Sequence, residues 1–200
     1  MRVEIEVTPE RGPIVNVPAT GAGFSSMTSV SDCSVRLSSG EKLTRIRVNT
    51  YSYVRLVAEL SDGKLYGVKT FVKASGGCSA PASSNSDATK SMIGQMKFRT
   101  FRPESGALPE AQFMMRHPQN SGLQMDQLTR LYIPPFFIEN LKIWQGDALL
   151  VEMEGGIAIS EDPNIRFNFK PNGADKFRVE AMDTNRKLFR DEWPLEKSVL

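Results

Sequence analysis

Residues 53–81 read YVRLVAELSDGKLYGVKTFVKASGGCSAP and contain two strand patterns, a turn and a cysteine. Apolar and polar residues alternate from 53 to 60, which is typical of a half-buried β-strand. Asp62-Gly63 is a residue pair that favours a tight hairpin turn, and residues 65–73 form the returning strand. The segment therefore predicts a β-hairpin that runs directly into Gly76-Gly77-Cys78.

The rest of the chain also carries short strand patterns separated by turns. In the first half they occupy residues 3–7, 14–17, 33–37 and 44–48. In the second half they occupy residues 95–101, 111–116, 136–144, 148–154, 164–169, 177–182 and 187–193, with a shorter run at 157–159. Short strands joined by a turn about every 8–12 residues are the pattern of an immunoglobulin-like β-sandwich.

A segment without large apolar residues separates the two halves. Residues 80–90 are rich in serine and alanine, which is typical of a flexible linker. Each half carries apolar strand faces that a second sheet must cover. We therefore predict an all-β chain of two immunoglobulin-like β-sandwich domains, residues 1–79 and 92–200, joined by a short flexible linker at 80–91.

The composition is ordinary for a globular protein, with 40% hydrophobic and 24% charged residues. A formal net charge of +2 gives no reason to expect nucleic acid as a partner. No apolar run approaches the ~20 residues of a membrane span, and residues 1–7 lack the apolar core of a signal peptide. No phosphate loop, zinc-ligand spacing or dinucleotide fingerprint occurs, so we expect no metal and no cofactor.

The single histidine, His117, precedes a proline at the end of a strand pattern. We interpret it as a hydrogen-bonded turn residue rather than a general base. Met114, Met115 and His117 together would offer soft ligands for copper. Adjacent strand residues face opposite sides, however, so at most one methionine could join His117, and copper is not favoured. No catalytic triad is readable, and we do not expect an enzyme.

The other chemically distinctive residue is Cys78, one of two cysteines in the chain. Two preceding glycines remove side-chain bulk and permit unusual backbone angles, so we expect an exposed thiol on a flexible arm of Gly76, Gly77 and Ser79. No sequence neighbour would activate the thiol, which therefore suits chemistry performed by another protein's active site. Two alternatives stay open: a non-catalytic binding module with a structural Cys33–Cys78 disulfide, and a thiol redox enzyme.

Several motifs resemble those of the sulfur carrier proteins SoxY and SoxZ. The first half resembles the C-terminal half of SoxY in segments 45–49, 54–59 and 62–66, and in VKASGGC at 72–78. The second half resembles SoxZ in RHPQNSG at 116–122, IPPFFI at 133–138 and GIAISEDPNIRFNF at 156–169. Both modules in one chain resemble the fused SoxYZ-like carriers associated with quinoprotein dehydrogenases.

This resemblance implies a periplasmic carrier, not an enzyme. Cys78 would hold sulfur intermediates covalently, with Gly76, Gly77 and Ser79 as its arm, and the second domain would dock and stabilise the first. The implied partners are redox proteins of the cytochrome c or quinoprotein dehydrogenase type, with no nucleic acid, membrane or cofactor. A periplasmic location implies an export leader that this sequence does not include. In SoxY the Gly-Gly-Cys arm lies near the chain end, whereas here a second domain follows, so an arm tethered at both ends has a limited reach.

Overall fold

The computed structural model describes residues 2–9, 32–37, 42–59, 62–80, 91–102 and 107–195, and its regular elements are β-strands. In the first half these are β1 (Arg2–Pro9), β2 (Asp32–Leu37), β3 (Lys42–Leu43), β4 (Ser52–Glu59) and β5 (Leu65–Val72). In the second half they are β6 (Met96–Phe101), β7 (Glu110–Met115), β8 (Ile138–Gln145), β9 (Ala148–Glu154), β10 (Asn164–Asn168), β11 (Lys176–Asp183) and β12 (Leu188–Pro194). The all-β class is confirmed.

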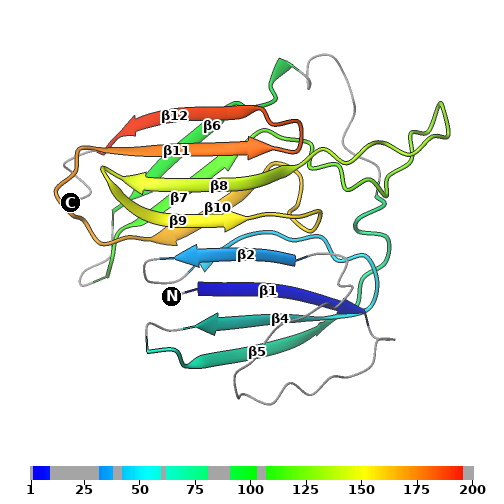
Figure 1. Cartoon of the computed structure of the whole chain (residues 1–200), viewed down its shortest axis with the longest axis horizontal. Helices are drawn as coiled ribbons and strands as arrows, with labels where there is room; N and C mark the ends of the chain where they lie inside the picture. Colours follow the sequence, from blue (N-terminus) through cyan, green and yellow to red (C-terminus); the bar gives the residue numbers. More distant parts are fainter. Residues whose placement is uncertain are drawn as a thin grey trace.

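The strands form two antiparallel sheets (Figure 1). The larger sheet has the order β12-β11-β8-β9-β2-β1-β4-β5, and the smaller has the order β3-β10-β7-β6. Alternate side chains of β7, β10, β8 and β11 point into the space between the sheets, as the period of a strand requires. Phe113, Ile143, Phe167 and Phe177 are among the fully buried residues there, so the described core is that of a β-sandwich.

Strands of the first half pair directly with strands of the second. In the larger sheet β2 pairs with β9, with Val35 opposite Met153. In the smaller sheet β3 pairs with β10, with Leu43 opposite Arg166. The two halves therefore share both sheets and are held by backbone hydrogen bonds as well as by packing. Residues 81–90 lie outside the described residues, so the linker stays a prediction.

The strand predicted at 44–48 is wrong as a regular element. The backbone there pairs with residues 158–160 over a few residues, through the bridge Ile46–Ile159 and the hydrogen bond from Arg47 N to Ala158 O at 2.6 Å. This pairing spans too few residues to form a β-ladder. For the same reason the run at 157–159 is not a strand. The strand predicted at 14–17 lies outside the described residues. Segment 44–49 instead supports the cysteine turn described below.

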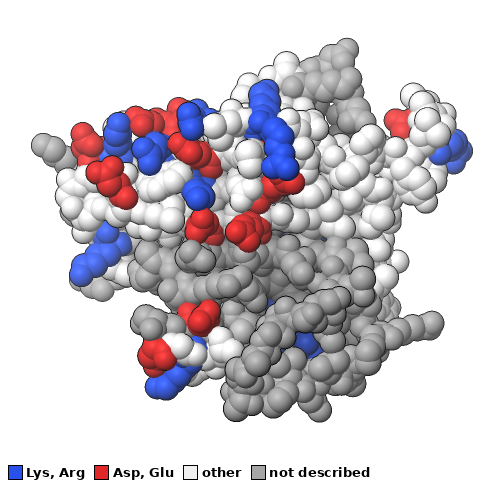
Figure 2. All heavy atoms as spheres, viewed as in Figure 1, with Lys and Arg blue, Asp and Glu red and all other residues white. Residues whose placement is uncertain are grey.

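Charged side chains gather on the outer face of the larger sheet, over β8, β9, β11 and β12 (Figure 2). They form cross-strand ion pairs: Lys142–Glu152 at 3.0 Å, Lys176–Glu192 at 2.8 Å and Arg190–Glu180 at 3.1 Å. Solvent screens such exposed pairs and they add little to stability, so this face has the properties of ordinary protein surface. No helix among the described residues is long and apolar enough to cross a membrane.

Candidate functional site: the docked cysteine arm

The cysteine arm, defined as residues 75–80, follows strand β5 and folds into a compact turn. Gly76 has φ +68°, in the left-handed region that an L residue adopts only with strain. Both the backbone N–H and the hydroxyl of Ser79 donate to the carbonyl oxygen of Gly76, at 3.1 and 3.2 Å. Glycine at position 76 is thus required by the shape of this turn.

The arm lies against the segment that precedes strand β4. A Cβ atom on Gly77 would lie 2.3 Å from the carbonyl oxygen of Val48, so only glycine allows this approach. Gly76 N donates to Asn49 O at 2.7 Å, and Cys78 N donates to Asn49 Oδ1 at 3.3 Å. We predicted the glycines as a flexible arm. In this structure they instead allow close packing, and the arm is docked.

The second half of the chain holds the other side of the arm. The hydroxyl of Ser121 donates to the carbonyl oxygen of Cys78, and Gln124 Nε2 donates to the carbonyl oxygen of Ala80 at 3.3 Å. Gln124 Oε1 accepts the backbone N–H of Ser121 at 3.0 Å, and both side chains belong to buried residues. The arm is therefore held between the halves by a few hydrogen bonds, each worth about 1 kcal/mol.

Cys78 itself is buried, with 2% of its surface exposed. This contradicts the exposed thiol that we predicted, because the sequence around Cys78 does not show which segments cover it. Cys78 is also a free cysteine, which contradicts the alternative of a Cys33–Cys78 disulfide. The backbone of Cys33 pairs with Ile5 in strands β2 and β1, and its side chain lies outside the description.

Burial raises the pKa of the Cys78 thiol, and the nearby Arg47 guanidinium offsets only part of this effect. The docked cysteine is therefore protonated at neutral pH and is a poor nucleophile. Burial likewise lowers the pKa of Arg47, against opposing charge effects of Glu161 and Cys78. Arg47 Nη1 donates to the carbonyl oxygen of Gln119, which keeps the guanidinium beside the arm.

His117 is buried and bonded as a turn residue, which confirms our interpretation. The imidazole Nδ1 of His117 accepts the backbone N–H of Gln119 at 3.3 Å, and the backbone N–H of His117 donates to Asp162 Oδ1 at 3.1 Å. Burial lowers the pKa of His117 to about 4, with Asp183 opposing the shift, so the imidazole is neutral at pH 7. These bonds fix the loop that continues to Ser121.

The copper ligand set weighed from the sequence is not brought together. Met115 is buried in the core between the sheets, while Met114 faces the other side of strand β7 and is half-buried. Within the described ranges, no three His, Cys, Asp or Glu side chains lie close enough together to hold a metal ion.

Sequence reasoning missed the residues that hold the arm: Arg47, Val48, Asn49, Ser121 and Gln124. Asn49 follows the predicted strand at 44–48, and Ser121 lies in a polar stretch after the strand predicted at 111–116. Their one signal in the sequence is that they lie in segments 45–49 and 116–122, which resemble SoxY and SoxZ, but that resemblance does not show what they contact. Their role depends on pairing between segments far apart in the chain.

Comparison with protein families gives two matches in order along the chain. The family described as "Sulphur oxidation protein SoxZ" matches residues 98–194, and "Sulfur oxidation protein SoxY" matches residues 30–78. The SoxY match ends on Cys78. A comparison with curated proteins found no match.

These findings place the chain among the carrier proteins of sulfur oxidation. In this chain a SoxY-like region is followed by a SoxZ domain, which is consistent with a SoxYZ-like fusion. Both matches lie within the two units predicted from the sequence.

Proposed function

We propose that this protein carries sulfur intermediates covalently on Cys78 and delivers them to redox enzymes in the periplasm. The main observation is that the SoxY match ends on a free cysteine that is held in place by hydrogen bonds and packing, with no covalent bond to the rest of the chain. Such a contact can open and close without breaking a covalent bond. The arm of Gly76, Gly77 and Ser79 would leave its docked position to expose the thiol.

The two positions of the arm would differ in reactivity. In the docked position, Cys78 is covered and its pKa is raised, so it is protected from oxidants and stray disulfide exchange. In the released position, the thiol regains an ordinary pKa and becomes accessible to a partner's active site. Docking would thus provide a resting state, and release would provide the working state.

Loading requires a partner that accepts electrons. When thiosulfate is joined to the thiol, the S–H bond breaks, an S–S bond forms between Cys78 and the outer sulfur, and one proton and two electrons leave. The described residues around Cys78 supply a cation, Arg47, and neutral hydrogen-bonding groups, but no electron acceptor. We therefore infer partners of the cytochrome c or quinoprotein dehydrogenase type, and a chain that performs no catalysis itself.

The proposal is tested by the intact mass of protein purified from its own cells without reductant. We expect mass added in steps of one sulfur or of a sulfur–oxygen unit, located on the Cys78 peptide and removed by reductant. The adduct should be absent from Cys78→Ser and retained in Cys33→Ser. An adduct that stays in Cys78→Ser would place the carrier site elsewhere and overturn the proposal.

A further inference from the structure

The burial of Cys78 means that a carrier needs a means of releasing its arm. Both hydrogen bonds that reach the arm from Ser121 and Gln124 come from one irregular hairpin, residues 120–136, which we call the latch hairpin. Its base is closed by two backbone hydrogen bonds between Asn120 and Phe136, at 2.8 and 2.9 Å. In Figure 1 this hairpin projects from the body of the sandwich.

Hydrogen bonds connect the two arms of the latch hairpin from its base to its tip. Ile133 N donates to Gln124 O at 2.8 Å, and Met125 and Tyr132 form a further bridge. At the tip, Asp126 Oδ1 accepts the backbone N–H groups of Leu128 and Thr129 at 3.0 and 2.8 Å. The hairpin can therefore transmit a displacement of its tip to its base.

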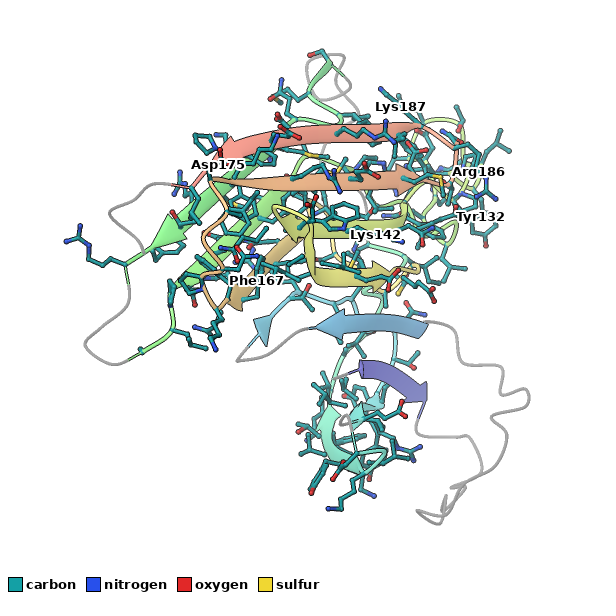
Figure 3. The ribbon with its side chains drawn as sticks, turned by 60° about the vertical axis from the view of Figure 1, so that its left-hand side comes forward. Tyr132, Lys142, Phe167, Asp175, Arg186 and Lys187 are labelled. Carbon is teal, nitrogen blue, oxygen red and sulfur yellow. The ribbon has the colours of Figure 1, made fainter. Side chains whose placement is uncertain are left out.

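The outer side chains of this hairpin are large, apolar and exposed. Leu128 is 94% exposed, Leu131 69% and Tyr132 67%. Leu123 and Met125, on either side of Gln124, are also exposed. Figure 2 shows the projecting hairpin as mostly uncharged surface, and Figure 3 places Tyr132 at the outer edge of the molecule. Exposed apolar side chains on a hydrogen-bonded projection contribute nothing to this chain's core and are typical of a binding surface.

We propose that the tip of the latch hairpin docks into the redox enzyme that loads or unloads Cys78, and that this docking opens the latch. The inference rests on the carrier function proposed above. The occupant is an enzyme acting on Cys78, because the exposed surface adjoins a residue that holds the arm: Gln124, which donates to the carbonyl oxygen of Ala80, lies between the exposed Leu123 and Met125. An enzyme seated on the tip is therefore placed beside the arm.

The chemistry of the tip also defines the kind of surface that receives it. Asp126 and Arg130 are one acid and one base, so the tip has no net charge to match, and the complementary surface is an apolar recess. The protruding side chains of Leu128, Leu131 and Tyr132 would bury little area on a partner. A small interface suits a transient complex that must dissociate after each transfer. Displacement of the hairpin backbone would lengthen the hydrogen bonds from Ser121 and Gln124 and free the arm.

The docking step is tested with the double variant Leu128→Ser/Leu131→Ser. Its matched control is Leu65→Ser/Leu149→Ser, which changes two exposed leucines near the starts of strands β5 and β9. Both strands begin at the end of the larger sheet that lies away from the latch hairpin (Figure 1). Each full-length protein is incubated with periplasmic extract of its own cells plus thiosulfate, and the adduct on Cys78 is followed by intact mass. We expect loading of the tip variant to be about ten-fold slower or more, the loss typical of hot-spot side chains, and the control to load at the wild-type rate.

The latch step is tested without any partner, by the rate of Cys78 alkylation in the folded protein. Ser121→Ala and Gln124→Ala should each accelerate alkylation about five-fold, the ratio that corresponds to one net hydrogen bond. The tip variant should be alkylated at the wild-type rate. Asn172→Ala, which removes the hydrogen bond to Gln145 O at 3.1 Å far from the arm, serves as the control for general loosening.

Three outcomes contradict the proposal. If the wild type is loaded and the tip variant is loaded equally fast, the tip is not the docking surface, while the carrier function stands. If the wild type acquires no adduct, the carrier function fails and the inference falls with it. If sedimentation shows that the wild type is a dimer and the tip variant a monomer, the tip binds a second copy of this chain and not an enzyme.

Discussion

The backbone of Gly77 lies against the backbone of Val48 so closely that a Cβ atom at position 77 would be 2.3 Å from the Val48 carbonyl oxygen. This contact brings the end of strand β5 against the segment before strand β4 and places Cys78 in its covered position. The second glycine of the Gly-Gly-Cys motif is thus a packing requirement of the docked arm.

Replacement of Gly77 by alanine should expel the arm from its docked position. The added methyl group would overlap backbone atoms, which cannot move aside as a flexible side chain can. We expect Cys78 in Gly77→Ala to be alkylated at least about ten-fold faster than in the wild type, as a loss of ~1.4 kcal/mol or more of docking free energy implies. The control is Gly67→Ala in strand β5, where the nearest atom would lie at 3.8 Å. Equal rates in the two variants would show that the arm is not held by this contact.

The charge of Arg47 should lower the pH at which docked Cys78 ionises, against the larger effect of burial. Because the guanidinium lowers the pKa of the thiol against the effect of burial, Arg47→Gln should raise that pKa further. The pH profile of Cys78 alkylation should then shift to higher pH. Arg47→Lys keeps the positive charge and should shift the profile less. A profile for Arg47→Gln that moves to lower pH would contradict this account.

Cys78→Ser should be mildly destabilising because position 78 is buried. A hydroxyl in place of a weakly polar thiol must be desolvated, at a cost of about 1–3 kcal/mol if no new partner is found. A thermal melt of the two proteins measures this difference. Reductant should leave the wild-type melting temperature unchanged, because Cys78 is free. A large loss of stability on reduction would restore the disulfide alternative.

His117 should make stability fall in mild acid. Its pKa is lowered to about 4 in the folded protein, below the ordinary value of 6.5, so the unfolded chain binds its proton first as the pH falls. The contribution of neutral His117 to the free energy of unfolding is fully present above pH 6.5. It is lost as the pH falls from 6.5 to about 4, and the loss amounts to up to about 3 kcal/mol.

The titration of His117 can be measured without a variant, because the chain has one histidine. Its imidazole NMR signals should hold constant from pH 8 to about 5 and move only near pH 4. Denaturant melts over the same pH range give the stability. A midpoint near 6.5 would mean that His117 is exposed to solvent.

Alternation of apolar residues was sufficient to predict most of the strands. Residues 65–73 became β5, residues 148–154 became β9, and the Asp62-Gly63 turn lies between β4 and β5 as predicted. These features depend on neighbours along the chain. Cys78 could likewise be identified from its local Gly-Gly motif, and the family comparison ends on the same residue.

The sequence by itself thus determined the all-β class and most of the strands, and it pointed to Cys78 as the residue on which the proposed function rests. Tertiary structure alone decided that Cys78 is covered, that Gly77 is a packing residue and that Ser121 and Gln124 hold the arm. It also decided that β2 joins β9 and β3 joins β10 across the two halves. The physical reason is that burial and strand pairing depend on segments separated by dozens of residues. Local periodicity carries no information about which of those segments meet.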